Sequence, residues 1–406
     1  MVQTVFILSL IVLVYGAYFA VTGLFAFVKN KTHIGSFQAS TRFAVLIPAR
    51  NEESVIGDLL KSLNDQDYPK ELYDVYAVIN NCTDDTRRQA LEYGAKVIDC
   101  EGMIKCKGDV LKYAFKTLEA SSHDAYVIFD ADNVVHPGFL RAMNNVYASG
   151  HKVGQGRKDS KNMGDNWISA SYSLFYNLQN FFYNRARTRI GAAATINGTG
   201  FMVAKEVVKD GFNPKTVTED IELALISLLK GYKVVYTDEA VTYDEQPTDF
   251  RTAWHQRKRW SRGIIQCLIR YSGPLFKRFI TKRDFSGLDK ILFTVSPIMQ
   301  IFALIPTVMT VVIFTGGFAR GFVINSMMFS TVAGLIIGYV ITVGMCIFTM
   351  WRYRQSIKEG MSGVFMFMVF MLTWIPINIC CNLRKNHTWV PVKHCRSVNL
   401  DKLIAR

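Results

Sequence analysis

Charge is scarce in this sequence. Only 20% of the 406 residues are Asp, Glu, Lys or Arg, half are hydrophobic, and the mean hydropathy is +0.14. This composition is too apolar for an ordinary soluble enzyme, and it excludes a disordered chain, a collagen-like repeat and a small disulfide scaffold. Paired cysteines are also missing. The eight cysteines include no CxxC spacing and no histidine partner at zinc spacing, so we expect free thiols.

Acidic residues are almost absent from the two ends of the chain. Residues 1–28 carry no charge, and residues 291–406 contain two acidic residues against ten basic ones. The formal net charge of +14 is therefore not one basic face. Basic residues between apolar stretches are typical of membrane flanks, and no run of Lys and Arg alternates with aromatics as in nucleic-acid binding motifs. We predict a lipid bilayer as a partner, and no nucleic acid.

Four uncharged or nearly uncharged stretches are long enough to cross a membrane. The first, residues 2–28, lacks the basic start of a signal peptide, and Lys29 and Lys31 follow it directly. These lysines predict an N-terminal transmembrane helix (1–28) with its start outside, a cytoplasmic domain (29–290), and a multi-pass protein of the plasma membrane. The other stretches, 291–319, 321–351 and 361–382, form a C-terminal transmembrane or interfacial region over residues 291–383.

The basic C-terminal residues leave the topology open. The tail, residues 384–406, holds six cations against Asp401, which favours the cytoplasmic side. Four spans that start outside would instead end outside. Both observations are satisfied if residues 361–382, interrupted by Pro376, lie in the interface or re-enter instead of spanning.

Residues 42–245 alternate between two kinds of segment. Apolar runs predict strands at 43–48, 73–79, 96–98 and 125–129, and apolar spacing predicts helices at 54–63, 84–93 and 108–120. This order predicts an α/β domain whose mostly parallel sheet is covered on both faces. Ligands of such sheets bind beyond the carboxyl ends of the strands. The first strand-to-helix turn has no GxGxxG and the chain has no GxxxxGK[ST], which disfavours a Rossmann oxidoreductase and a P-loop enzyme.

Charged residues follow the predicted strands. Asp130 and Asp132 end a buried strand, and two such carboxylates can share a hard cation with diphosphate oxygens. The ordinary alternative is a solvated turn. Lys107 and Gly108 open the preceding helix, where an ammonium and backbone N–H groups can face the same anion. A simple helix start explains the same pair.

Two further groups carry candidate chemistry. Thr218 precedes a helix predicted at 220–229, with Glu219 and Asp220 in its first turn, an arrangement that helix capping explains, although Asp220 also suits a general base. Gln256, Arg259 and Trp260 share one helix face and together suit a sugar acceptor stacked on the indole. The alternative for this second group is an interfacial amphipathic helix.

Taken together, these groups form an ordered set of motifs. In chain order they are Pro48-Ala49-Arg50-Asn51-Glu52-Glu53, Asn81-Cys82-Thr83-Asp84-Asp85, Lys107-Gly108, Asp130-Ala131-Asp132, Asn197-Gly198-Thr199-Gly200, Thr218-Glu219-Asp220 and Gln256-x-x-Arg259-Trp260. The set resembles the membrane-embedded family 2 glycosyltransferases, which include cellulose, hyaluronan, chitin and poly-N-acetylglucosamine synthases. The resemblance covers about residues 42–275, and the flanking apolar stretches agree with it.

The resemblance implies a GT-A domain that binds a UDP-sugar with Mg²⁺ or Mn²⁺ and inverts the transferred sugar. It implies nucleotide-sugar contacts from Glu52, Glu53, Asn80, Lys107, Asp130, Gln256 and Arg259. It implies metal ligation by Asp132 with Asp130, catalysis by Asp220 with Glu219, and acceptor contacts from Trp260, Gly198 and Thr199. Asn80 departs from the family, which usually has aspartate there. An amide still pairs with a uracil edge, but it removes one negative charge near the diphosphate.

Two other stretches have two interpretations each. Interfacial helices are expected around 166–187 and 250–285, and the first, rich in aromatics, either packs under the domain or lines the acceptor route. The stretch Trp389-Val390-Pro391-Val392-Lys393-His394 is loosely similar to a gating loop of some family members, and otherwise it is a plain tail.

Three functions are compatible with the sequence. The leading one is a processive synthase that extends an extracellular polysaccharide and translocates it, with a possible accessory membrane subunit. The second is a non-processive transferase that adds one sugar to a lipid acceptor. The third is an inactive membrane scaffold or sugar sensor. Asn80 suggests this function, whereas the retained acidic residues argue against it.

Overall fold

The computed structural model describes residues 2–29, 31–101, 104, 106–316, 322–381, 396, 398 and 400–404. The first part of the chain contains α1 (Val2–Leu24), η1 (Phe25–Phe27), β1 (Phe43–Ala49), α2 (Ile56–Asn64), η2 (Lys70–Leu72), β2 (Tyr73–Ile79), α3 (Thr86–Glu92), β3 (Lys96–Asp99), α4 (Lys107–Thr117), β4 (Ala125–Ile128), β5 (Val134–Val135) and α5 (Phe139–Ala148). The middle contains β6 (Val153–Ser160), α6 (Trp167–Leu178), η3 (Gln179–Arg185), α7 (Ala186–Arg189), β7 (Phe201–Ala204), α8 (Lys205–Val208), α9 (Glu219–Lys230), β8 (Val234–Asp244) and α10 (Phe250–Lys282). The last part contains α11 (Phe285–Thr315), α12 (Phe322–Arg352), α13 (Ile357–Leu372), α14 (Trp374–Cys380) and α15 (Leu400–Ile404).

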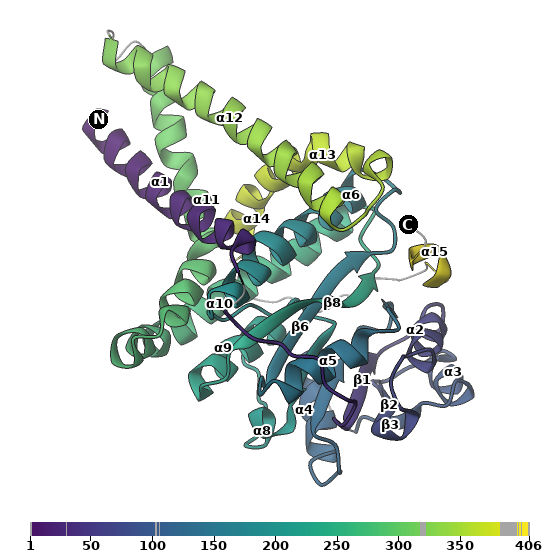
Figure 1. Ribbon diagram of the computed structural model, residues 1–406. Coiled ribbons are helices and arrows are strands. Elements are labelled where there is room, and N and C mark those ends of the chain that lie inside the picture. Colours follow the sequence, from purple (N-terminus) through teal and green to yellow (C-terminus); the bar gives the residue numbers. More distant parts are fainter. Residues whose placement is uncertain are drawn as a thin grey trace.

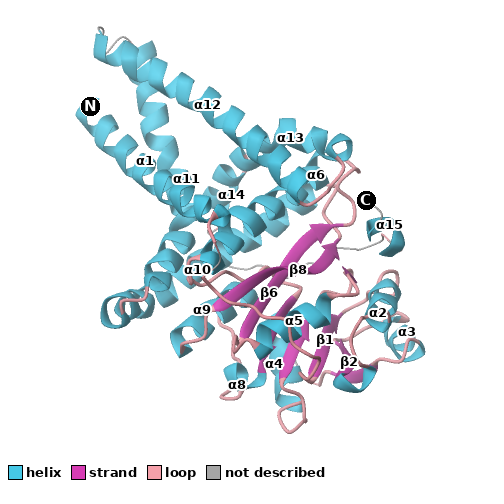
Figure 2. Cartoon of the chain, in the orientation of Figure 1, coloured by secondary structure: helices cyan, strands magenta, loops and turns pink. Residues whose placement is uncertain are grey.

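The eight strands form one mixed sheet in the order β3-β2-β1-β4-β7-β6-β8-β5. β1 pairs in parallel with β2 and β4, and β2 with β3, as the order of sequence segments predicted. The second half of the sheet differs, because β7 runs antiparallel to β4 and β6, and β5 runs antiparallel to β8. Figure 2 shows the strands gathered in one part of the molecule, with α1, α11 and α12 extending away from them.

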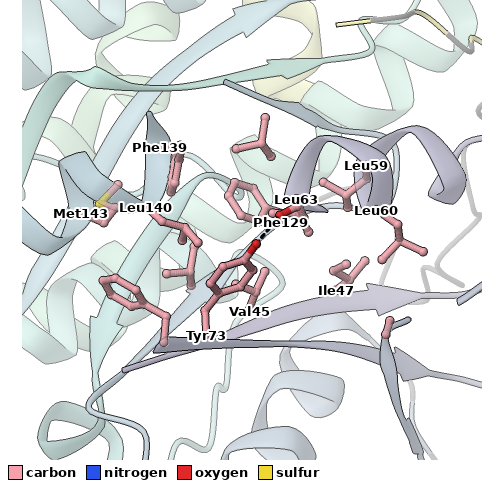
Figure 3. Close-up of a cluster of buried hydrophobic side chains, with 14 of the residues drawn as sticks. Val45, Ile47, Leu59, Leu60, Leu63, Tyr73, Phe129, Phe139, Leu140 and Met143 are labelled. Atoms are coloured by element: carbon pink, nitrogen blue, oxygen red, sulfur yellow. Dashed lines mark hydrogen bonds between the residues drawn. The ribbon is translucent and has the colours of Figure 1, made fainter. Parts of the chain in front are cut away.

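Two apolar clusters cover the two faces of this sheet. Successive side chains of a strand point to opposite faces, so Val45 and Ile47 join one cluster while Ala44 and Leu46 join the other. In the first cluster, residues of α2 and α5 pack over β1, among them Leu59, Leu63, Phe139 and Leu140 (Figure 3). α4 and α9 cover the second face. The helices thus bury both faces and leave the carboxyl ends of β1, β2 and β4 to polar loops.

Among the described residues, four helical stretches are long and apolar enough to cross a membrane: Val2–Phe27, Phe285–Thr315, Asn325–Arg352 and Ile357–Cys380. Figure 1 shows α1, α11 and α12 projecting together from one side of the sheet domain. The first three apolar windows are only 6%, 17% and 6% buried, whereas the fourth is 39% buried. The fourth stretch therefore differs from the others in how much of it packs against protein.

That fourth stretch lies against the sheet domain. Gly363 of α13 packs so closely on α6 that an added Cβ would lie 2.5 Å from the Ala170 Cβ. The buried Arg257 of α10 donates to the Phe370 carbonyl (3.2 Å) and to the Thr373 hydroxyl (2.7 Å). The helix is interrupted at Thr373, before Pro376, because proline disturbs the turn that precedes it.

A buried polar cluster joins α1, α7 and α11. The Arg187 guanidinium lies 3.0 Å from an Asp289 carboxylate oxygen, and both side chains are almost fully buried. The Tyr18 hydroxyl donates to the same oxygen at 2.6 Å. The predicted aromatic helix at 166–187 is the continuous run of α6, η3 and α7, and through Arg187 it holds the sheet domain against two apolar helices.

The end of the chain returns to the sheet domain. The Arg396 backbone N–H donates to Glu245 (3.2 Å) and that of Val398 donates to Asp58 (3.1 Å). Leu403 of α15 is buried against Val134, Val241 and Tyr243. Residues 389–394, interpreted above as a gating loop or a plain tail, lie outside the described residues.

Candidate active site

Loops that follow β1 and β2 are tied together at one edge of the sheet. The Asn51 side-chain oxygen accepts from the Thr83 N–H (2.8 Å), and the Glu53 carboxylate accepts from the Asp85 N–H (2.9 Å). The Glu52 N–H donates to the Thr86 hydroxyl at 2.8 Å. Glu52 and Glu53 therefore lie in a loop that is joined to the loop after β2, and the Glu53 carboxylate holds that neighbouring loop.

Asn80 follows β2 directly and is nearly buried, with 5% of its surface exposed. Its backbone N–H donates to the Ala49 carbonyl (3.0 Å), and its side-chain oxygen accepts from the Asn81 amide (3.1 Å). This pairing fixes the orientation of the Asn80 amide beside the loop that carries Glu52 and Glu53. Asn51 and Asn81 both have positive φ, a conformation that asparagine tolerates better than most residues.

Three carboxylates converge at the ends of β4 and β8. Single oxygens of Asp130, Asp132 and Asp244 lie within 4.8 Å of one another. Carboxylate oxygens in such a group are the ligands that Mg²⁺ and Mn²⁺ prefer. The donor set therefore fits a divalent cation, and the Asp130-x-Asp132 pair predicted from sequence supplies two of its three members.

Asp244 was missed by the sequence analysis. It ends β8, more than a hundred residues after Asp132, and lies beside it because β8 pairs with β5, which follows the Asp132 turn. Asn133 donates to one Asp244 oxygen (2.9 Å), and the Lys158 ammonium lies 2.7 Å from the other. Burial alone would lower the pKa of Lys158, but Asp244, together with Tyr176 and Asp130, outweighs burial and raises it.

Lys107 connects the acidic cluster to the loop that follows α7. Its ammonium donates to the Asp130 carboxylate and to the Gly198 carbonyl, the latter at 2.7 Å. Burial would lower the pKa of Lys107, yet the charges of Asp130 and Glu219 raise it above its usual range. Lys107 therefore stays protonated, as a contact to a diphosphate requires.

Gly198 and Thr199 take different positions. Gly198 has a φ of 84°, and an added Cβ would lie 3.6 Å from an Asp220 carboxylate oxygen, so this glycine faces the catalytic candidate. Thr199 is fully buried, and its hydroxyl accepts from the Asp130 N–H (3.0 Å) and donates to Asn133. In this conformation Thr199 holds the acidic cluster in place and has no surface to offer an acceptor.

Glu219 and Asp220 open α9 as predicted. The expected cap is not formed, since the Thr218 side chain makes no capping hydrogen bond and instead packs on Gly263 of α10. Burial raises the pKa of both carboxyls; repulsion from Asp220 adds to that of Glu219, and Lys107 and Arg259 only partly offset the rise. A carboxyl whose pKa is raised is a stronger base, which suits proton removal from a hydroxyl.

The Gln256-x-x-Arg259-Trp260 face of α10 meets this region. The Arg259 guanidinium donates to the Val217 carbonyl (3.1 Å), next to the start of α9. Trp260 stacks on Trp374 of α14, with ring centroids 6.3 Å apart and planes 27° apart. The Gln256 side-chain oxygen is buried, and the described residues offer it no hydrogen-bond partner. Such an unsatisfied acceptor is typical of a ligand-binding position.

The sequence matches one family model, described as "Glycosyltransferase like family 2", over residues 41–263, which is more than half of the chain. "Probable glycosyltransferase YdaM" of Bacillus subtilis is 28% identical over 257 residues, covering 58% of each chain. "Beta-monoglucosyldiacylglycerol synthase" of Nostoc sp. is 26% identical over 260 residues, 62% of this chain and 55% of that protein. "Poly-beta-1,6-N-acetyl-D-glucosamine synthase" of Staphylococcus epidermidis is 25% identical over 247 residues, 57% of each chain. The chain thus spans little more than half the length of these relatives.

Among solved structures, the mannosyltransferase PcManGT from Pyrobaculum calidifontis, in complex with GDP-Man and Mn²⁺, is similar to this chain. The TM-score is 0.62 at 15% identity, with 91% of this chain and 99% of that chain covered. At this level of identity the likeness shows a shared fold.

Proposed function

This chain belongs to the glycosyltransferase-like family 2 and is a glycosyltransferase with a GT-A fold and four helices that are apolar enough to cross a membrane; on this premise we propose that it transfers one sugar from a nucleotide sugar to a lipid in the bilayer. The transfer inverts the sugar in a single displacement. The protein lies in the plasma membrane with its sheet domain in the cytoplasm, where nucleotide sugars are made.

The donor diphosphate binds between Lys107 and the carboxylates of Asp130, Asp132 and Asp244. Asp130, Asp132 and Asp244 would hold Mg²⁺ or Mn²⁺, which would offset the charge that develops on the leaving diphosphate. Lys107 supplies a fixed positive charge at the same place. PcManGT, which shares the fold, was solved with a nucleotide sugar and Mn²⁺, and this supports the assignment. Asn80, Glu52 and Glu53 receive the base, for which we propose uridine.

Asp220 removes the proton from the acceptor hydroxyl as the sugar bond forms, and the leaving diphosphate departs toward Lys107. Burial raises the pKa of Asp220, and Glu219 lies in the same turn, where burial and the Asp220 charge raise its own pKa. Arg259 faces both carboxylates from α10 and approaches the start of α9 through the Val217 carbonyl. One positively charged group on each side of the acids thus keeps Asp220 sufficiently ionised to act as a base.

The proposal of a lipid acceptor is based on the contact between Trp260 and α14. Trp260 follows Arg259, whose guanidinium reaches the Val217 carbonyl next to the start of α9, and it stacks on Trp374 of the apolar stretch Ile357–Cys380. The acceptor side of the site therefore borders a helix that is apolar enough to lie in lipid. A hydroxyl of a lipid head group reaches Asp220 from the bilayer without leaving it. The Nostoc relative, named as a diacylglycerol glucosyltransferase, is consistent with this acceptor class.

A second candidate is elongation of an extracellular polysaccharide. It is favoured by the Gln256-x-x-Arg259-Trp260 motif and by the relative named as a poly-N-acetylglucosamine synthase. A conduit for a hydrated polymer needs helices that pack on neighbours on both flanks, however, and the apolar windows of α1 and α12 are each only 6% buried. One chain of this kind would not enclose such a conduit, so polysaccharide elongation would require further copies or an accessory subunit.

The topology that we propose places Ile357–Cys380 in the cytoplasmic interface, with three true crossings. Gly363 and Phe370 of this stretch contact α6 and α10 of the sheet domain. The contacts of Arg396 and Val398 with the sheet domain support a position of these residues on the same side as that domain. Three crossings starting outside end inside, which agrees with the basic tail.

The test uses purified protein in nanodiscs that contain diacylglycerol or polyprenyl phosphate, supplied with Mn²⁺ and a panel of radiolabelled UDP- and GDP-sugars. We expect label from a UDP-sugar in the organic extract, dependent on the cation and absent with Asp220→Asn. Label in an alcohol-insoluble polymer would favour the second candidate. No transfer from any nucleotide sugar with any acceptor would refute the proposed function.

A further inference from the structure

A cavity of about 740 Å³ opens where α10 turns into α11, away from the acidic cluster. The ends of three helices meet there: α9 ends at Lys230, α10 ends at Lys282, and α11 begins at Phe285. Asp220 lies at the opposite end of α9, about 15 Å away along a helix that rises about 1.5 Å per residue. This cavity is therefore separate from the catalytic site.

Five cations and one carboxylate line the cavity. The cations are Lys230, Lys233, Arg278, Lys282 and Arg283, and the carboxylate is Asp284. Arg278 (2.8 Å) and Lys233 (3.3 Å) both pair with Asp284, and these cations lower its pKa against the effect of burial. Lys230 pairs outside the cavity with Asp210 (3.2 Å), so two carboxylates stand against five cations and the cavity keeps an excess of positive charge.

Helix capping explains part of this charge. Cations near Lys230 and Lys282 stabilise the negative ends of α9 and α10, and Asp284 caps α11 through the Ser286 N–H (3.1 Å). Capping does not explain a hollow of this size between the three ends, nor why Lys282 and Arg283 are both exposed at its rim. Packed helix ends would be expected to fill such a space.

The cavity lies level with the end of α1, the first of the apolar helices. Asp289 is one and a half turns beyond Asp284 on α11 and contacts Tyr18 of α1, so the two helices are in register there. From Tyr18, α1 continues for six residues to Leu24, and Lys29 follows. The cavity and the end of α1 thus lie about 7–9 Å from the Asp289 contact in the same direction, toward the sheet domain.

Exposed apolar side chains occur at the cavity and elsewhere on α10. Phe285 lines the cavity and is 39% exposed, whereas Phe276 and Ile280, which are 54% and 59% exposed, lie on the other face of α10 from Arg278 and Lys282. A helix that combines exposed apolar side chains with Lys and Arg lies at the boundary between head groups and acyl chains. A small soluble anion has no use for the Phe285 ring, whereas an acyl chain of a phospholipid covers it.

We propose that this cavity binds the phosphodiester head group of an anionic phospholipid. Lys282, Arg283 and Lys233 contact the phosphate, and an acyl chain lies along the exposed Phe285 ring at the cavity. The bound lipid holds the elbow between α10 and α11 in the cytoplasmic leaflet. Because α10 also carries Arg259 and Trp260, it fixes the height of the catalytic residues above the membrane.

The test compares lipids retained by the full-length protein after release from nanodiscs of phosphatidylcholine with a minor fraction of phosphatidylglycerol, counted by native mass spectrometry. We expect wild type to retain phosphatidylglycerol preferentially. The Lys282→Gln/Arg283→Gln variant should lose about thirtyfold in this preference, since each cation near an anionic surface contributes about fivefold. The matched control, Arg270→Gln/Lys277→Gln, removes two exposed cations from the same helix outside the cavity and should keep the preference.

Four results would overturn the proposal. Equal losses in both double variants would show general surface attraction, and no preference in wild type would show that no site exists. The cavity variant could also lose thermal stability and still retain as much phosphatidylglycerol as wild type. That result would show that Lys282 and Arg283 only stabilise the helix ends. Inorganic phosphate that displaces phosphatidylglycerol completely, and stabilises the protein equally in phosphatidylcholine alone, would show a site for a free anion.

Discussion

Replacing Asp220 with asparagine separates chemistry from binding and folding. The change keeps the shape of the side chain, removes the base, and leaves the diphosphate contacts of Lys107 and the acidic cluster in place. General bases contribute about 10² to 10⁴ in rate. At about 1.4 kcal/mol per factor of ten, the variant should lose about 3–5 kcal/mol of transition-state stabilisation while nucleotide affinity changes little.

The same change should not destabilise the fold. Burial raises the pKa of Asp220, so the folded protein binds its proton more tightly than the unfolded chain does, and ionisation at neutral pH costs folding free energy. Asparagine carries no charge and removes this cost. We therefore expect a melting temperature equal to or above that of wild type, measured by thermal unfolding in detergent at neutral pH.

Glu219→Gln is the matched control, because it removes one charge from the same helical turn, beside the same Lys107 and Arg259. Initial rates of sugar transfer at saturating donor, together with nucleotide affinity by calorimetry, compare the two variants. We expect the control to lose less than about tenfold in rate. A larger loss in Glu219→Gln than in Asp220→Asn would refute the assignment of the base, and a joint loss of rate and nucleotide affinity would refute the separation of roles.

Four further predictions concern the surrounding residues. Arg259 lowers the raised pKa of Asp220, so Arg259→Gln should move the acid limb of the kcat/KM profile to higher pH; an unmoved limb would contradict this coupling. Asp244→Asn should weaken Mn²⁺ at least about tenfold in metal titrations of transfer, and an unchanged titration would remove Asp244 from the metal site. Asp289→Asn leaves buried cations uncompensated and should cost about 3–5 kcal/mol in the free energy of unfolding, so a melting temperature like that of wild type would contradict the role of the cluster. Cys395 should resist an impermeant thiol reagent in sealed cells and react after permeabilisation; labelling from outside would contradict three crossings.

Much of the fold was predictable from local sequence. The segments that became β1 to β4 and the helices between them form apolar runs and helical periods, because each buries its own face on the sheet. The antiparallel β7 and the β5–β8 pair were not predicted, since β7 has four residues, β5 has two, and both depend on partners far along the chain. The position of Ile357–Cys380 was left open, because hydropathy does not distinguish an apolar face covered by lipid from one covered by α6 and α10.

The candidate site was also only partly predictable from the sequence. Asp130, Asp132, Lys107 and Asp220 occur in short motifs at element ends, and the structure brings them together as the motifs indicated. Asp244 and its partner Lys158 have no motif, since a single acid at the end of a strand is ordinary and only the pairing of β8 with β5 and β6 places it beside Asp132. The burial of Thr199 was not predictable either, because a loop sequence does not reveal which of its side chains faces the core.

If the protein adds one sugar to one membrane lipid, the mass of the lipid product shows it. Protein in nanodiscs with diacylglycerol, Mn²⁺ and the UDP-sugar that supports transfer is extracted with organic solvent, and the extract is measured by mass spectrometry. We expect a lipid that is heavier by a single sugar residue, without products that carry two or more added residues. A ladder of many added residues, or polymer that stays out of the organic phase, would contradict the proposed transfer of one sugar.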